Sequence, residues 1–392
     1  EIMPSLVGSE MCIRDSHWID GMKINKGHFL SVQDSMSDML RDGIGIHLSM
    51  QNYGLLPVEN SLKLSLSIDN HKLLRVRVEE CQAVTPNGSR ISIGKGVAEQ
   101  LQLSIPYPEA AYELKDDENI TLLACISVNL FKRIPFGEPD PDENPPRYPF
   151  TQPEYNLHLI PENELKNTVG FGLSYLTIGK VLVNAGESRI DENYIPPCVN
   201  VSSHLKLKDL YSSIEHFYGQ MELYSVQIEQ KIRVKNQNNS LAVMIGLLAE
   251  KTLNYLGMEI NRFRWLSPHR PPVEMLLSVV SLARVLKNFI DARSGAGKEE
   301  LLNYFSEWCN LTQGNFEQIF TEVINSDYDH NQMDIVIKKI IVFMKTLEEL
   351  FSILNRLDYI GKKRDGSIFV SENTDEREAV VHAKRSRTFL AD

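Results

Sequence analysis

The spacing of apolar residues changes once along this sequence, and that change constrains the fold more than any other feature. Before about residue 194, apolar residues alternate with polar ones, as Leu62, Leu64 and Leu66 do, which is the period of a half-buried strand. After the segment 194–200, apolar residues recur at steps of three and four, which is the period of a helix. The sequence therefore predicts an α+β protein with an N-terminal β region and a C-terminal α region.

The β region contains strand and turn signals but no helical pattern between its strands. Pro86-Asn87-Gly88 is a hairpin signal, because glycine readily takes a positive φ. The runs 122–131 and 174–183 are apolar enough for central strands. Since parallel strands need long crossovers, we expect an antiparallel β-sandwich. Seven prolines lie in 133–153, so we expect a long surface loop there.

The α region predicts a bundle of four long helices, with a shorter helix pair, 298–311 and 313–325, inserted before the last. The first and last long helices keep their steps of three and four over many turns, a 3.5-residue period that suits supercoiled helices. One such stripe is usually covered inside its own chain. Two in one chain favour self-association, and the expected seam consists of Ile214, Phe217, Met221, Tyr224, Ile340, Phe343, Leu347, Leu350 and Leu354.

The length of 392 residues exceeds what one compact core usually holds, so we expect two or three units. We expect a β-sandwich domain with an N-terminal arm over 17–200, a helical bundle over 201–360 and a polar tail over 361–392. Residues 1–16 lack both the basic start and the apolar run of a signal peptide, and we expect them to be a non-native leader.

Composition argues against several classes of function. The formal net charge is −11 at pH 7, whereas nucleic-acid binding needs a concentrated basic face. The five cysteines are far apart and form no metal-ligand motif, which favours reduced thiols in a cytoplasmic protein. No window of 18 uninterrupted apolar residues is present, so we expect no insertion into a membrane.

Motifs for catalysis are also missing. The stretch 294–300 resembles a phosphate-binding loop, but Ala292 and Glu299 occupy two positions that this motif reserves for Gly and for Ser or Thr. The acidic stretch 327–334 lacks the Gly and the final Glu of a calcium loop. We therefore expect a protein that is not an enzyme and that needs no cofactor and no metal.

Five short motifs, in this order along the chain, carry a resemblance to a known family. They are Trp18 with Gly21-Met22, His28-Phe29 and Gln33; Tyr53-Gly54-Leu55; Pro86-Asn87-Gly88-Ser89; Tyr194-Ile195-Pro196-Pro197; and the helix-like segment 267–286. In these places the sequence resembles TssK, the baseplate component of type VI secretion systems. The resemblance implies a cytoplasmic homotrimer with a β-sandwich shoulder, a helical neck and a C-terminal head. It also implies a shoulder that binds the wedge proteins TssF and TssG, and a head that meets the membrane complex.

The end of the chain departs from that pattern. The residues after Leu357 are polar and charged, apart from short runs such as Ile368-Phe369-Val370, and are too few to bury the core of a head domain. We therefore expect a shortened subtype, in which contact with a membrane complex is doubtful.

Aromatic residues near the N-terminus and in the proline-rich segment are the candidates for partner binding. We expect Trp18, His28 and Phe29 to dock the N-terminal arm into a sheet or a neighbouring subunit, because aromatic side chains supply much contact area. Replacing Trp18 or Phe29 by Ala should then cost a few kcal/mol. The segment 133–153 is either a gripping loop or a solvated insertion, and its candidates are Phe136, Tyr148 and Phe150. A phage-type receptor-binding or carbohydrate-binding protein is the alternative function.

Overall fold

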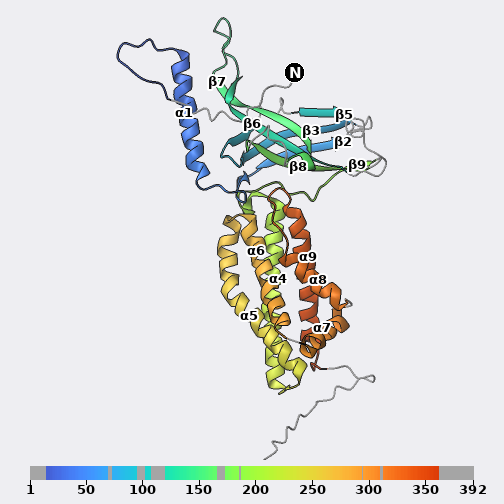
Figure 1. The fold of residues 1–392 in the computed structure, drawn as a ribbon. Helices are drawn as coiled ribbons and strands as arrows, with labels where there is room; N and C mark the ends of the chain where they lie inside the picture. The colour runs from blue at the N-terminus through green and yellow to red at the C-terminus, as the bar shows by residue number, and fades with distance from the viewer. Residues whose placement is uncertain are drawn as a thin grey trace, which may run out of the picture.

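The computed structural model describes residues 15–68, 73–94, 102–106, 120–165, 173–184, 187–293, 295–309 and 312–361. Strands make up most of the first half of the chain and helices the second half, as the change in apolar spacing predicts (Figure 1). Most of the expected leader and all but the first residue of the expected tail lie outside the described residues.

The first sheet is built around its longest strand, β3, and all of its pairings are antiparallel. The predicted turn joins β3 to β4: Gly88 has a φ of +82°, and the Thr85 amide donates to the Ser89 carbonyl at 2.9 Å. Residues of β3 and β4 that face inward, such as Val78 and Ile91, are fully buried. The strands are β1 (Gly54–Leu55), β2 (Leu62–Ile68), β3 (Leu73–Val84), β4 (Arg90–Ile93) and β5 (Gln102–Pro106).

The second sheet has the strand order β7-β6-β8-β9 and is also antiparallel. The apolar run 122–131 lies in β6, an inner strand that is covered on both faces: Leu122 belongs to the main core, and Leu123 to a smaller cluster on the opposite face. Burial on both faces explains why this run does not alternate. The strands are β6 (Ile120–Phe136), β7 (Phe150–Pro161), β8 (Tyr175–Asn184) and β9 (Glu187–Ile190), and the short α3 (Glu162–Leu165) follows β7.

The proline-rich segment is a shorter loop than the sequence predicts, because its two ends pair as strands. Pro135 lies opposite Thr151, and Pro153 lies opposite Arg133, so the hairpin ladder continues beyond the sheet. Proline is tolerated there because β8 pairs with β6 only over 120–127, which leaves this part of β6 at an edge. The connecting loop is therefore 137–149 instead of 133–153.

The two sheets face each other across one core. A Cβ atom added to Gly179 of β8 would lie 2.9 Å from Leu66 Cδ1 and 3.1 Å from Leu64 Cδ2, both in β2. Only glycine leaves room for so close an approach between the sheets.

The chain leaves the strands through an extended segment that pairs with the start of the first sheet. Leu55 forms a parallel bridge with Cys198, and its amide donates to the Pro197 carbonyl at 2.8 Å. Gly54 has a φ of +112°, and a Cβ atom added there would lie 2.0 Å from the Pro197 carbonyl oxygen. This contact fixes the start of the first sheet to the segment that leads into the C-terminal helices.

The helices begin where their caps predict. The Asn239 side chain accepts from the Ala242 amide at the start of α5, the Thr312 side chain caps α8, and Pro272 opens α6. The elements are η3 (Val201–Ser203), α4 (Leu205–Val234), α5 (Ser240–Leu266), η4 (Ser267–His269), α6 (Pro272–Asp291), α7 (Ala296–Cys309), α8 (Gln313–Ile324) and α9 (Met333–Arg356).

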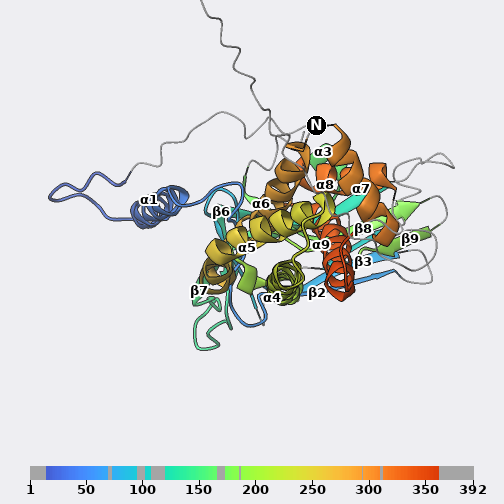
Figure 2. The same ribbon diagram turned by 90° about the horizontal axis from the view of Figure 1, so that it is seen from below.

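The long helices α4, α5, α6 and α9 run side by side away from the sheets, and α7 and α8 lie beside α6 and α9 (Figures 1 and 2). At the far end, the Lys231 ammonium of α4 donates to the carbonyls of Leu354, Asn355 and Leu357, where α9 ends. Most of the buried apolar residues form one cluster that runs from the sheets into the helices.

A buried polar network joins the loop before α9 to both sheets. His330 Nε2 lies 2.9 Å from the Tyr53 carbonyl, which can only accept, so Nε2 carries the proton and Nδ1 accepts from the Tyr328 hydroxyl at 2.6 Å. The Tyr194 hydroxyl donates to Thr177 Oγ1, which donates to Asn331 Oδ1, each at 2.8 Å. Burial lowers the pKa of His330 to about 4.

Candidate partner-binding surfaces

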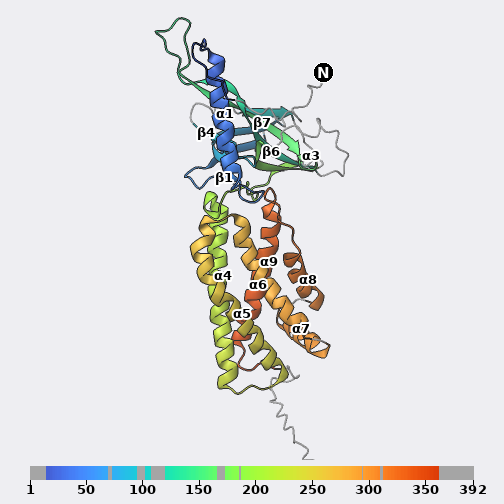
Figure 3. The same ribbon diagram turned by 60° about the vertical axis from the view of Figure 1, so that its left-hand side comes forward.

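Helix α1 (Lys26–Gly45) stands beside the two sheets instead of packing among the other helices (Figures 1 and 3). Its start is capped in both directions. The Asn25 side chain accepts from the Gly27 amide at 2.8 Å, and His28 Nδ1 accepts from the Asn25 amide at 3.2 Å. No residue of α1 is buried, so the helix offers most of its length to solvent.

The three aromatic residues proposed for the N-terminal arm come together at this capped end. The Trp18 ring centroid lies 6.0 Å from that of His28 and 6.5 Å from that of Phe29. Trp18 is 47% exposed and Phe29 is 62% exposed. In the single chain these side chains are therefore not docked into a sheet. Docking against a neighbouring subunit stays a prediction.

Helix α1 is tied to the second sheet through a few polar contacts. Asp34 Oδ1 lies 3.0 Å from Arg133 Nη2 of β6, and the Arg41 guanidinium lies over the Phe131 ring, 5.9 Å from its centroid. A Cβ atom added to Gly88 would lie 3.2 Å from the Arg41 side chain, so the β3–β4 turn also approaches α1. These contacts hold the helix alongside the root of the β6–β7 hairpin.

The β6–β7 hairpin carries the remaining three aromatic candidates. Phe136 and Phe150 lie opposite each other in the ladder, just before the loop. Phe150 is 65% exposed, Tyr148 is 48% exposed and Phe136 is half-buried. The loop has its own order, because the Asp140 amide donates to the Arg147 carbonyl at 3.0 Å.

The hairpin tip and the start of α1 both project at the end of the sheets away from the helices (Figures 1 and 3). Five of the six aromatic candidates lie on these two elements, which the Asp34–Arg133 ion pair connects, and Trp18 lies in the segment before α1, with its ring near those of His28 and Phe29. This end of the molecule is called the distal aromatic surface below, and it consists of Trp18, His28, Phe29, Phe136, Tyr148 and Phe150. Large exposed aromatic side chains gathered on projecting elements are typical of protein-binding surfaces.

The residues expected to form an oligomer seam lie elsewhere. All of them except Tyr224 are buried by the chain's own helices, and Tyr224 is half-buried. Steps of three and four serve the core of a single chain as well as a contact between chains, which is the alternative that the sequence left open. In the single chain these side chains pack against the chain's own helices. The residues are Ile214, Phe217, Met221, Tyr224, Ile340, Phe343, Leu347, Leu350 and Leu354.

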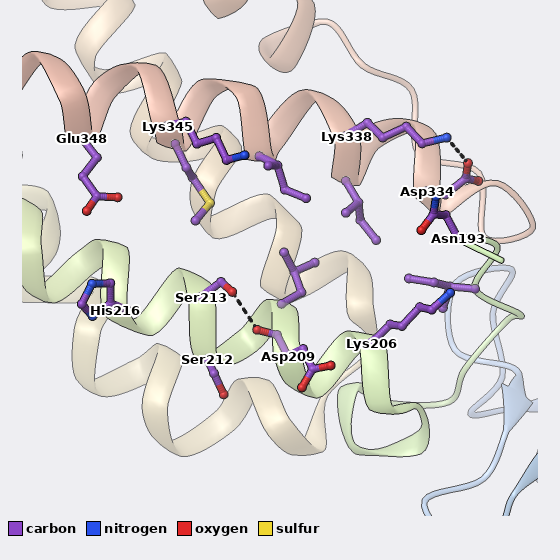
Figure 4. A pocket seen from close by; sticks show the side chains of 15 residues that line it. Asn193, Lys206, Asp209, Ser212, Ser213, His216, Asp334, Lys338, Lys345 and Glu348 are labelled. Carbon is purple, nitrogen blue, oxygen red and sulfur yellow. Dashed lines mark hydrogen bonds and ion pairs between the residues drawn. The ribbon is translucent and has the colours of Figure 1, made fainter.

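A groove between α4 and α9, close to the sheets, was not predicted (Figure 4). It encloses about 900 Å³. Asp334 at the start of α9 is 5% exposed; its Oδ2 accepts from the Lys338 ammonium at 3.0 Å, and its Oδ1 has no partner among the described residues. The other lining residues include Leu210, Ile337, Ile341 and Met344 as apolar floor, with Lys206, Asp209, His216, Lys345 and Glu348 around them.

Among the described residues no group of metal ligands is present, and three cysteines are too deeply buried to react readily. No group of three or more His, Cys, Asp or Glu side chains among them is placed to hold a metal ion. Burial raises the pKa of the Cys81 and Cys125 thiols to about 12 and raises that of Cys198 as well, so these thiols are poor nucleophiles at neutral pH. In the described part of the chain, no helix combines the length and the apolarity needed to cross a membrane.

Comparison with known proteins gives a structural likeness only. No family model matches the sequence, and no curated protein matches it. A chain of the baseplate complex from the type VI secretion system is similar in structure, with a TM-score of 0.50 and 13% identity; the match covers 87% of this chain and all of that one.

Two further solved structures have similar values. The TssK–TssF–TssG baseplate subcomplex matches with a TM-score of 0.49 and 13% identity over 86% of this chain and 99% of that one. A crystal structure of TssK matches with a TM-score of 0.49 and 13% identity over 87% of this chain and 70% of that one. At 13% identity the likeness to the baseplate complex establishes the fold alone: this chain has the fold of a protein of the type VI secretion baseplate.

Proposed function

We propose that this chain is a structural adaptor of a type VI secretion baseplate that assembles as a homotrimer and binds wedge proteins of the TssF and TssG type. In that role it acts in the cytoplasm, performs no catalytic step, and couples the contractile tail to its envelope anchor. The shared fold supports this proposal, and so do the five sequence motifs that resemble TssK.

The architecture suits a rigid spacer with a binding end. We propose that the two facing sheets form a β-sandwich shoulder within 17–200, and that α4, α5, α6 and α9 form a four-helix neck within 201–360. The continuous apolar core and the buried network around His330 leave little freedom for the shoulder to rock on the neck. A rigid spacer of this kind keeps the proteins bound at its two ends at a fixed distance and orientation.

The observation that carries the proposal is the distal aromatic surface. Tyr148, in the ordered loop, and Phe150, at the start of β7, expose their aromatic rings, so little conformational entropy is lost when a partner covers them. We propose that the wedge proteins bind at this surface, with the β6–β7 hairpin as one contact and the start of α1 as another.

The test is capture by purified wedge proteins of the TssF and TssG type from the same bacterium. We expect the unmodified chain to be captured, and Tyr148→Ser with Phe150→Ser to weaken capture about tenfold or more, the usual cost of removing interface anchors. Trp265 on α5 is 75% exposed and lies far from the hairpin in the sequence, so Trp265→Ser is the matched control. If the chain does not bind the wedge proteins but binds glycans, the result favours the alternative function, a phage-type receptor-binding or carbohydrate-binding protein.

A further inference from the structure

Helix α1 has the opposite polarity to a helix that packs on its own protein. Its inner side, toward the sheets, carries Asp34 and Arg41, which contact Arg133 and Phe131 of β6. An amphipathic helix of an isolated domain normally turns its apolar stripe to the core and its charges to water.

The outer side of α1 carries the large apolar side chains. Phe29 is 62% exposed, Met36 60%, Met39 70% and Leu40 68%. At 100° per residue, Phe29, Met36 and Leu40 lie within about 40° of one another around the helix, and Asp34 and Arg41 lie on the far side. Phe29, Met36 and Leu40 therefore form one exposed apolar stripe, which marks an interaction surface.

The spacing in this stripe suits a second helix with the same repeat. Phe29, Gln33, Met36 and Leu40 follow one another at steps of four, three and four, the repeat that lets one helix pack along another of the same repeat. None of these four side chains is charged, so two copies of the stripe can meet without repulsion between like charges. Gln33 carries both a donor and an acceptor and can bond to its own counterpart across the contact.

We propose that the outer stripe of α1, formed by Phe29, Gln33, Met36 and Leu40, packs against the same stripe on a second copy of this chain. The inference deepens the proposed function, because it names the surface through which the proposed oligomer is held at the shoulder. It also places the contact between copies outside the helical core, where the seam residues are already covered by their own chain. Wedge proteins as the cover of this stripe are the competing outcome of the test.

The first experiment is cross-linking of Met36→Cys, since Met36 lies near the middle of the stripe, within about one helical turn of its counterpart in either helix direction. Cys81, Cys125 and Cys198 are buried and stay in place, whereas Cys12 and Cys309 are changed to Ser to remove background. The matched control is Met258→Cys on α5, an exposed methionine, at 75%, on another helix. Under mild oxidation, without any wedge protein, we expect Met36→Cys to form covalent dimers and Met258→Cys not to do so. Equal cross-linking of the two variants overturns the proposal.

The second experiment changes the charge of the stripe. Because Met36 and Leu40 are exposed, Met36→Lys with Leu40→Lys should leave the circular dichroism melt unchanged while weakening self-association about tenfold or more, as buried like charges do. Mass by light scattering over a dilution series is the readout, and Met258→Lys is the control. Unchanged mass at every dilution, or an unmodified chain that is a monomer throughout, overturns the proposal.

Capture by wedge proteins separates this inference from the proposed function. The charged variant should self-associate less and still be captured by the wedge proteins, if more weakly through lost avidity. Normal self-association with loss of capture assigns the stripe to the wedge proteins and overturns the inference. If Met36→Cys forms cross-linked dimers but the unmodified chain is not captured by the wedge proteins, the inference is confirmed and the proposed function is wrong.

Discussion

Replacing His330 by Phe tests the buried network that joins the strands to the helices. His330 is 3% exposed, its ring packs edge-on against Tyr53, and its two nitrogens bond to the Tyr53 carbonyl and the Tyr328 hydroxyl. Phe keeps the ring but removes both hydrogen bonds. Leaving two buried groups without partners should cost about 2–4 kcal/mol of unfolding free energy at pH 7.

The same substitution should flatten the dependence of stability on pH. Burial lowers the pKa of His330 from the ordinary 6.5 to about 4, so between these pH values the unfolded chain binds a proton more readily than the folded chain. The contribution of His330 to the free energy of unfolding is therefore fully present above pH 6.5 and is lost as the pH falls toward 4. Integrated between pH 7 and pH 5, the loss is about 2 kcal/mol in the unmodified chain and absent in His330→Phe.

Urea unfolding, followed by circular dichroism at pH 7 and pH 5, measures both effects. His204, whose pKa burial also lowers to about 4, is present in both proteins and cancels from the difference. The control is His269→Phe, because His269 is exposed in η4. If His330→Phe loses as much stability between pH 7 and pH 5 as the unmodified chain, the reasoning is wrong.

Three further predictions concern single contacts. Lys231→Met removes the ammonium that bonds three carbonyls at the end of α9 and should lower the unfolding free energy by about 1–3 kcal/mol, read from the urea midpoint; an unchanged midpoint would contradict it. Gly54→Ala forces a Cβ atom against the Pro197 carbonyl at a positive φ, so we expect insoluble protein or a loss of more than about 3 kcal/mol; a soluble, equally stable variant would refute this. Phe29→Ala should change the unfolding free energy of the dilute monomer by less than about 1 kcal/mol, because its ring is exposed, and a loss of several kcal/mol would show that the ring is buried.

Local periodicity predicted the elements well where one face of an element is buried. The alternation at Leu62, Leu64 and Leu66 marks β2, and the turn at Gly88 joins β3 to β4. The helix-like segment 267–286 contains most of α6, and the prolines in it mark the start of that helix at Pro272. In each case the signal is local, so the sequence carries it without knowledge of tertiary neighbours.

The proline-rich segment was predicted less well because strand position matters more than composition. Pro135 and Pro153 were expected to prevent pairing, yet both lie in the β6–β7 ladder. A proline is excluded from a strand only where its missing N–H would face a partner, and which edge it faces depends on the order of strands in the sheet. That order is a property of the whole fold.

For the binding surfaces too, the sequence indicated some features and not others. The aromatic candidates of the distal aromatic surface were chosen from residue type alone, and their binding of a partner stays a prediction. The sequence could not tell an apolar stripe buried in its own chain, such as that of Phe343 and Leu347, from one covered by another copy. Nor did it indicate the groove beside Asp334, since α4 and α9 are brought together only by the tertiary fold.

The length of β6 has a mechanical consequence for any force that acts on the hairpin tip. This single strand of 17 residues runs from the tip into the middle of the second sheet, where it is bonded on both sides by antiparallel neighbours. A pull along its axis loads these many bonds at once, in shear, instead of peeling them apart one after another. The whole sheet that anchors the hairpin therefore resists a force applied to its loop.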